Sequence, residues 1–187
     1  TGKELVAHTI HLNSPRRDQP LIKLCCADLP DHVLEAELFG HEKGALAGAS
    51  RQRRGRVELA HKGTLLLDDV ETLSPILQAK LWRVLQSRKF ERVGGRESIE
   101  LDVRILCASR QDLREAVGQG RFRQDLCEWL SAVQIMVPPL RERREDVLVI
   151  AEHVLEVTSE RLNRSLKGFS QPSCDLLLHY SFPGNVA

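Results

Sequence analysis

Aromatic side chains make up only 4% of this sequence of 187 residues, which makes a base-stacking platform for nucleic acid a weak candidate. Long apolar runs are also missing: none approaches the roughly eighteen residues of a membrane-spanning helix, and the first residues lack the charged-then-apolar pattern of a secretory signal. Neither sign of charge dominates, since 27 Lys and Arg oppose 26 Asp and Glu. No global field therefore draws the chain to nucleic acid or to an anionic membrane. We expect a soluble, cytoplasmic protein that makes no membrane contact.

The spacing of the cysteines disfavours two further classes of protein. The five cysteines are an odd number with no CxxC pair, which argues against a disulfide framework and against a zinc cluster. We expect free and mostly buried thiols at Cys25, Cys26, Cys107, Cys127 and Cys174. With 42% apolar residues the chain can bury a core, and its length suits one domain with or without a small appendage.

Short apolar runs alternate with helical stretches along most of the chain. Four runs are expected to form strands buried on both faces, at residues 21–25, 63–68, 103–107 and 133–137. Helices are expected between them at residues 31–38, 75–86 and 112–117. Gly40 closes the first helix, and Ser74 caps the second, which has Pro75 at its first position. Strand alternating with helix predicts an α/β fold whose parallel sheet is covered on both sides.

The character of the sequence changes after Pro139. A densely charged stretch at residues 141–145 is followed by apolar residues at helical spacing, and a second helix is expected at residues 172–179. Nothing in this part has the pattern of a strand. We therefore predict an α/β core at residues 1–139 and a small all-helical subdomain at residues 140–187.

Gly2 and Lys3 stand directly ahead of an amphipathic helical pattern, as at the end of a phosphate loop. In such loops backbone amides at a helix N-terminus bind anionic oxygens, and the lysine reaches the terminal phosphates. Taken alone, a Gly-Lys pair is more often an ordinary surface start of a helix. The glycine-rich half of the loop is not in the chain and no strand precedes the helix, so we expect the front of the core to be missing.

Two acids at the end of a buried run strengthen the nucleotide interpretation. Asp68 and Asp69 follow three leucines. One acid can hold the water shell of Mg²⁺ while the other orients an attacking water. Two acids after a strand can also form a solvated loop, but their place after Gly2 and Lys3, with a helix and a strand between, favours a site for a Mg²⁺-nucleotide.

Six motifs occur in order along the chain: ELFGHEKGA at residues 37–45, GTLLLD at 63–68, FERVGG at 90–95, FRQDL at 122–126, PPLRER at 138–143 and FPGNV at 182–186. With these motifs the sequence resembles the central AAA+ domain, or sigma-54 interaction domain, of bacterial enhancer-binding proteins, the transcription activators of sigma-54 RNA polymerase. The resemblance covers essentially the whole chain. It implies an AAA+ P-loop NTPase fold, with a parallel sheet flanked by helices and a C-terminal all-helical lid that is truncated here.

Domains of this family form ring-shaped oligomers, commonly hexamers, which hydrolyse ATP between subunits. They use the movement driven by hydrolysis to remodel a closed promoter complex. The resemblance therefore implies ATP and Mg²⁺ as cofactors, self-association into a ring, and sigma-54 RNA polymerase holoenzyme as the partner. Promoter DNA would be bound through a domain absent from this chain.

Five positions match the family's nucleotide contacts. Gly2 and Lys3 match the end of the phosphate loop, and Glu4 follows them, as is usual in this family. Asp68 matches the acid associated with the metal. Arg110 falls where the family's sensor asparagine normally reads the γ-phosphate, and the resemblance makes it a cofactor-binding position.

Two positions match catalytic residues of the family. Asp69 stands where the family usually has the Glu that polarises the attacking water, and Arg123 matches the first of two arginines that act across the subunit boundary on the neighbour's phosphates. An Asp carboxylate lies about 1.5 Å further back than that of Glu, and such a misplacement costs on the order of 10² in rate. Trp129 replaces the second arginine, and Cys25 replaces an asparagine that restrains the catalytic acid.

These departures, with Arg110, leave three hypotheses open. The first is an ATP-driven remodelling module of a sigma-54 activator. The second is a nucleotide-binding or scaffolding regulatory module of the same family that has lost efficient hydrolysis. The third is a decayed copy that neither assembles nor binds nucleotide. Ala187 stands where the family usually has a sensor arginine, as a substitution or as the end of a fragment.

A partner loop is implied at six consecutive residues, Gly44, Ala45, Leu46, Ala47, Gly48 and Ala49. They resemble the Gly-Ala-Phe-Thr-Gly-Ala loop that contacts the sigma factor in this family. Leu46 replaces the phenylalanine anchor and Ala47 has lost the threonine hydroxyl, which weakens the expected contact. Four arginines follow within six residues and are either a solvated turn or a contact with promoter DNA or an acidic polymerase surface: Arg51, Arg53, Arg54 and Arg56.

Overall fold

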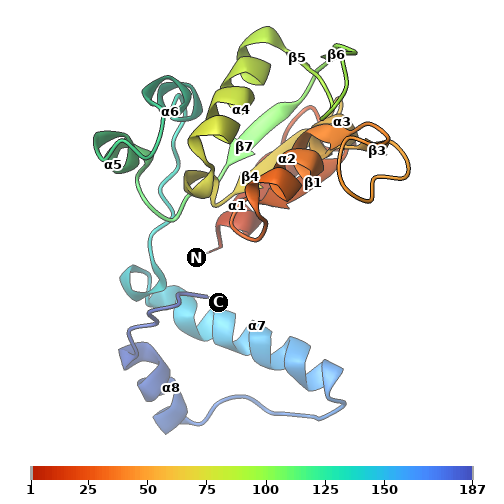
Figure 1. The fold of residues 1–187 in the computed structure, drawn as a ribbon. Coiled ribbons are helices and arrows are strands. Elements are labelled where there is room, and N and C mark those ends of the chain that lie inside the picture. Colours follow the sequence, from red (N-terminus) through yellow and green to blue (C-terminus); the bar gives the residue numbers. More distant parts are fainter. Residues whose placement is uncertain (1, 187) are drawn as a thin grey trace. The chain divides into compact units, whose positions relative to one another are not determined.

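Three parallel strands form the central sheet of the computed structural model (Figure 1). β1 (Leu21–Cys25), β4 (Thr64–Asp68) and β7 (Arg104–Cys107) lie in the order β1-β4-β7, so the run of three leucines is the middle strand. These leucines are at most 2% exposed, because helices cover both faces of the sheet. The first three of the predicted strands are confirmed.

Short helices and two hairpins surround the sheet. In chain order they are α1 (Lys3–Leu12), α2 (Asp31–Phe39), β2 (Gly40–His41) with β3 (Arg53–Arg54), α3 (Arg56–Leu59), η1 (Val70–Thr72), α4 (Pro75–Ser87), β5 (Lys89–Phe90) with β6 (Ile99–Glu100), α5 (Leu113–Gly118) and α6 (Gln124–Leu130). The hydroxyl of Ser74 accepts from the Leu77 N–H at 3.4 Å, and Asp112 accepts from the Arg114 N–H at 2.9 Å. These N-caps fix the starts of α4 and α5, and each of the three predicted helices is confirmed to within one residue.

Alternate residues of β4 point to opposite faces of the sheet. Leu66 packs with Ala7 of α1 on one face. Leu65 and Leu67 belong to the larger cluster on the other face, which also contains buried residues of α2 and α4 such as Leu38. The predicted parallel sheet flanked by helices is confirmed.

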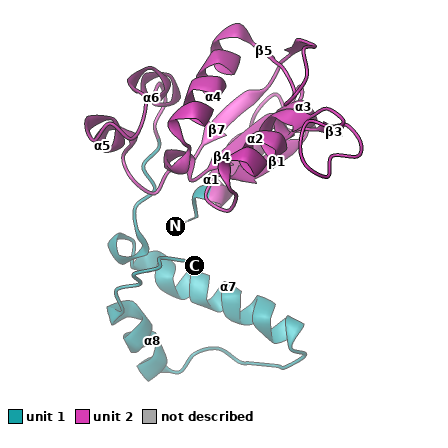
Figure 2. Ribbon diagram, in the orientation of Figure 1, with its two compact units in different colours: residues 1–3, 135–187 teal, residues 4–134 magenta. Residues whose placement is uncertain are grey.

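The structure describes residues 2–186, whose contacts divide the chain into two units (Figure 2), residues 4–134 and residues 1–3 with 135–187. The second unit contains η2 (Leu140–Glu142), α7 (Glu145–Arg161) and α8 (Gln171–His179). As predicted, no strand occurs after Pro139 up to residue 186. The side chain of Asn185 accepts from the Leu140 N–H at 3.1 Å, while Ala187 lies outside the described residues. Every helix of the described chain is too short or too polar to span a bilayer.

The prediction of a fourth strand at residues 133–137 is wrong. This segment between α6 and η2 forms neither helix nor strand, and Val133, Ile135 and Met136 are 84%, 58% and 80% exposed. An apolar, β-branched pattern reports only the preference of side chains, whereas a strand also needs a neighbour for its backbone N–H and C=O groups. Within residues 2–186, the parallel sheet pairs only β1, β4 and β7.

The close approach of two backbone segments at Gly63 predicts a large effect on stability. A Cβ at this position would collide with the carbonyl oxygen of Pro20, so Gly63→Ala is expected to destabilise the fold by about 1–3 kcal/mol. Gly118→Ala is the matched control, because a Cβ there has no atom within 4 Å and alanine is the better helix former. Urea unfolding of both variants tests this, and equal losses would contradict the collision.

Candidate functional site

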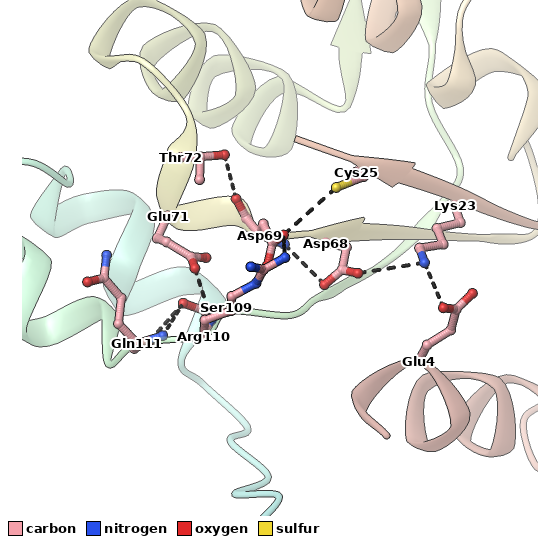
Figure 3. Close-up of polar contacts among 10 residues, drawn as sticks. All are labelled: Glu4, Lys23, Cys25, Asp68, Asp69, Glu71, Thr72, Ser109, Arg110 and Gln111. Carbon is pink, nitrogen blue, oxygen red and sulfur yellow. Dashed lines mark hydrogen bonds and ion pairs between the residues drawn. The ribbon is translucent and has the colours of Figure 1, made fainter. Parts of the chain in front are cut away.

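The acids predicted from the sequence lie at the edge where the parallel strands end (Figure 3). Asp68 is the last residue of β4, its register partner Cys25 is the last of β1, and Arg110 follows the end of β7. The carboxyl ends of parallel strands form the edge at which ligands bind in α/β folds. We define the strand-end site as Glu4, Lys23, Cys25, Asp68, Asp69 and Arg110.

Asp69 is held in a fixed orientation at the centre of the strand-end site. It is only 3% exposed and has a left-handed backbone, with φ of 54°, which aspartate tolerates better than most residues. Its N–H donates to the Asp68 carboxylate at 3.1 Å, and its carbonyl oxygen accepts from the Thr72 hydroxyl at 2.7 Å. These two hydrogen bonds fix the backbone of Asp69, from which its buried carboxylate projects.

Arg110 clamps this carboxylate with two parallel hydrogen bonds. Its Nε donates to Oδ1 of Asp69 at 2.7 Å and its Nη2 donates to Oδ2 at 2.6 Å. The hydrogen bond to Asp69 raises the pKa of Arg110. The backbone N–H of Arg110 donates to the Glu71 carboxylate at 3.0 Å. The predicted cofactor-binding arginine thus lies in the site, with its guanidinium directed at the predicted catalytic acid.

Cys25 approaches the same carboxylate from β1. Its sulfur lies 3.8 Å from Oδ2 of Asp69, and burial, with the charges of Asp28 and Asp69, raises the pKa of its thiol. The thiol is therefore a protonated and weak donor, in place of the amide that the resemblance leads one to expect. The five cysteines are free thiols, of which Cys26 and Cys127 are buried, and burial raises the pKa of Cys26 to about 12.

Lys23 is a member of the strand-end site that the sequence reading missed. Its ammonium donates to Glu4 of α1 at 2.6 Å and lies 3.7 Å from Oδ2 of Asp68. The hydrogen bond to Glu4 raises the pKa of Lys23, against a smaller effect of burial. The available signal was its place in the middle of the apolar run at residues 21–25, because a lysine within a buried strand calls for a partner.

The remaining predicted nucleotide residues lie outside the strand-end site as defined here. Gly2, with φ of 91°, and Lys3, the first residue of α1, are grouped with the second unit. Arg123 precedes α6 and binds Asp125 of its own helix through two hydrogen bonds of 3.0 and 2.7 Å. Trp129 is a half-exposed residue of the same helix, with 36% of its surface accessible.

The predicted partner loop connects β2 to β3 and has a compact form. Gly44 and Gly48 both have a positive φ, of 78° and 84°. The Gly44 N–H donates to the Ala49 carbonyl at 2.9 Å, and the Ala49 N–H donates to the Leu46 carbonyl at 3.0 Å. The loop is closed on itself by its own backbone, with Leu46 half-buried and Ala47 exposed.

Three of the four arginines that follow the loop are engaged in ion pairs within the chain. Arg53 and Arg56 both contact Glu37, at 2.7 and 3.1 Å, and Arg54 contacts Glu58 at 3.0 Å. Their carboxylate partners are less exposed than the arginines themselves. These ion pairs attach three of the arginines to α2 and α3, an arrangement that differs from the solvated turn expected from the sequence and leaves the contact with DNA or polymerase a prediction.

The strand-end site combines three carboxylates with two cations of the same chain. Glu4 and Asp68 share the ammonium of Lys23, and Asp69 is neutralised by Arg110. Carboxylates at this edge suit a cation with a polyphosphate, or the positioning of a water. Both tasks require that a ligand compete with the cations already in place.

Comparison with known families gives two matches that together cover nearly the whole chain. The model of the sigma-54 interaction domain matches residues 1–136, and that of the AAA+ ATPase lid domain matches residues 141–187. The Nif-specific regulatory protein of Herbaspirillum seropedicae is 51% identical over 186 residues, and the transcriptional regulatory protein ZraR of Salmonella typhimurium is 49% identical. All of this chain aligns with each, but it spans only 34% and 42% of their lengths.

Solved structures agree with the sequence comparisons. A crystal structure of NtrX from Brucella abortus superposes with a TM-score of 0.91 at 36% identity, over 99% of this chain and 40% of that one. The same protein has been crystallised in complex with ADP and with ATP, and both complexes superpose with a TM-score of 0.90. The fold predicted from the six motifs is confirmed.

Proposed function

Because this chain belongs to the sigma-54 interaction domain family of AAA+ ATPases, we propose that it is the ATP-binding and ATP-hydrolysing module of a sigma-54-dependent transcriptional regulator that remodels the RNA polymerase closed complex. The observation that carries the proposal is the meeting of two motifs at the strand-end site. Lys23 contacts both Glu4, which follows the phosphate-loop lysine, and Asp68 at the end of β4. The ATP complexes of the similar NtrX support nucleotide binding.

Each predicted site residue has a proposed role in this function. Gly2 and Lys3 bind the phosphates at the start of α1, where backbone amides and an ammonium group meet anionic oxygens. Asp69 orients the attacking water. Arg123 acts on the nucleotide of a neighbouring subunit in a ring, and Arg110 reaches a phosphate only by leaving Asp69.

Mg²⁺ is the second proposed cofactor, and the chemistry of the site fits a cation. Glu4 and Asp68 are hard oxygen donors that converge on a positive charge in this structure, the ammonium of Lys23. No cluster of three or more His, Cys, Asp or Glu that could hold a metal occurs in the described part of the chain, so the ion would take its other ligands from phosphates and water. When bound beside Asp68, Mg²⁺ supplies positive charge to the phosphate oxygens.

We further propose that turnover is slow in this member of the family. Asp69 is shorter than the usual glutamate, and both of its carboxylate oxygens are engaged by Arg110. Cys25 offers only a weak donor at 3.8 Å. The water that attacks the γ-phosphate therefore lacks a free carboxylate to orient it until this pair opens.

The proposed partners follow from the family and from the surface of the molecule. The loop at residues 44–49 contacts sigma-54 in the RNA polymerase holoenzyme, and copies of the module assemble in a ring, commonly a hexamer. Promoter DNA is bound through another domain of the regulator. A bacterial polymerase as partner implies a cytoplasmic location.

Restoring the lost anchor is expected to strengthen the contact with sigma-54. In the full-length protein with ADP and aluminium fluoride, Leu46→Phe with Ala47→Thr should lower the Kd for sigma-54 by about tenfold, because a buried aromatic anchor is worth more than 1 kcal/mol. Ile76→Phe, at a 77% exposed position of α4, is the control and should leave the Kd unchanged. Fluorescence anisotropy of labelled sigma-54 measures both. An unchanged Kd in the loop variant rejects the role of the loop, and the absence of any nucleotide-dependent complex rejects the proposed function.

A further inference from the structure

Two carboxylates from different elements converge on one lysine at the strand-end site. Glu4 is in the first turn of α1 and Asp68 ends β4, yet both contact the ammonium of Lys23, at 2.6 and 3.7 Å (Figure 3). Lys23 is the register partner of Leu66, which packs on Ala7 of α1. Its side chain is therefore on the α1 face of the sheet.

The ammonium of Lys23 lies close to the place that a divalent cation bound to Asp68 would take. An ion bound to Asp68 would lie about 2.1 Å from a carboxylate oxygen, and Lys23 is already 3.7 Å from Oδ2 of that residue. An ion bound to this oxygen would lie beside the Lys23 ammonium, and two neighbouring positive charges repel one another where water is partly excluded. Lys23 is 39% exposed, so a nucleotide can reach it from solvent.

The chemistry of the ammonium group suits a phosphate oxygen as a further partner. An ammonium has three N–H donors and no acceptor, and contacts with Glu4 and Asp68 engage two of them at most. Hydrogen bonds from a charged donor are worth about 1.5–3 kcal/mol, which corresponds to about tenfold or more in affinity. Lys23 can thus offer a bound polyphosphate a fixed positive charge.

We propose that Lys23 supplies to bound ATP the positive charge that otherwise arrives with Mg²⁺, so that binding of ATP needs little Mg²⁺ whereas hydrolysis still requires it. This inference rests on the proposed function, because it assumes that a nucleoside triphosphate binds at the strand-end site. It makes the nucleotide-bound state of the module insensitive to the concentration of free Mg²⁺.

The test is the Kd of a fluorescent ATP analogue for the full-length protein, measured in excess Mg²⁺ and in excess EDTA. In the wild type, removal of Mg²⁺ is expected to raise the Kd by less than about threefold. In Lys23→Met, which keeps the apolar stem, the same change is expected to raise it by about tenfold or more. Lys23→Arg keeps the charge and should behave as the wild type.

Lys89→Met is the matched control, since Lys89 is also a strand lysine and its ammonium lies 3.7 Å from the carboxylate of Glu100. The ratio of its Kd in EDTA to its Kd in Mg²⁺ should equal that of the wild type. A wild-type Kd that rises tenfold in EDTA overturns the inference, as does a Lys23→Met ratio equal to that of the wild type. Absence of binding by the wild type in both buffers refutes the proposed nucleotide module itself. The melting curve of Lys23→Met shows whether this variant folds. If it does not fold, the two Kd values of the wild type alone decide the test.

Discussion

Replacing Asp69 by Glu and Arg110 by Asn together is expected to raise the ATP turnover of the full-length protein by about 10²-fold or more. Two obstacles are removed at once. The longer side chain advances the carboxylate by about 1.5 Å, and the loss of Arg110 frees the two oxygens that its guanidinium engages at 2.7 and 2.6 Å. The freed carboxylate can then orient the attacking water.

The two single variants are expected to gain much less than the double variant. Asp69→Glu leaves the guanidinium of Arg110 in place to bind the new carboxylate. Arg110→Asn frees a carboxylate that remains too short. Because the two side chains are in direct contact, their effects on turnover should be coupled in a double-mutant cycle.

Steady-state release of phosphate measures the four proteins, and Arg114→Asn serves as the control. Arg114 is an exposed residue of α5, so its loss changes the net charge equally without opening the Asp69 pair. Arg110→Asn removes the counter-charge of the buried Asp69, which is expected to lower stability. Thermal melting of each variant therefore distinguishes a loss of stability from a change in turnover. A wild type as fast as the double variant, or a double variant no faster than the wild type, would show that the pair does not limit hydrolysis.

Much of the fold follows from local sequence patterns. The three leucines of β4 and the capping residue Ser74 each place an element correctly, because burial on both faces and N-cap chemistry are encoded within a few residues. The segment at residues 133–137 shows the limit of this reasoning. Its pattern is that of a strand, but pairing depends on a neighbour elsewhere in the chain. The two-residue strands β2, β3, β5 and β6 carry no periodicity from which to predict them.

The candidate site, like the fold, could be predicted from the sequence only in part. Asp68 and Asp69 were predicted from the sequence because they directly follow a run of three buried leucines. The partners that decide their chemistry were not found, since Arg110 is 41 positions away from Asp69 and Lys23 reaches Asp68 only when β1 and β4 pair. Resemblance assigned Arg110 to a phosphate, but it could not show that this guanidinium is directed at the catalytic acid.

A second large effect is expected at Arg92, which joins the base of the partner loop to the core. Its side chain is only 10% exposed, and its guanidinium donates to Glu58 of α3 at 3.0 and 3.1 Å and to Glu42, two residues before the loop, at 3.0 Å. Arg92→Met fills similar space but removes the buried cation that these two carboxylates share. Removal of one partner from a buried ion pair costs about 3–5 kcal/mol, so we expect a loss of about 3 kcal/mol in urea unfolding.

Arg54→Met is the matched control for Arg92→Met, because Arg54 contacts the same Glu58 at 3.0 Å but is 72% exposed. Solvent screens that pair, and its loss should cost less than about 1 kcal/mol. Arg92→Met should also weaken the binding of sigma-54 and speed proteolysis between residues 44 and 53, since Glu42 is no longer held. Equal losses of stability in the two variants would show that burial does not distinguish the pairs. If Arg92→Met is destabilised but its Kd for sigma-54 is unchanged, Arg92 stabilises the core without positioning the partner loop.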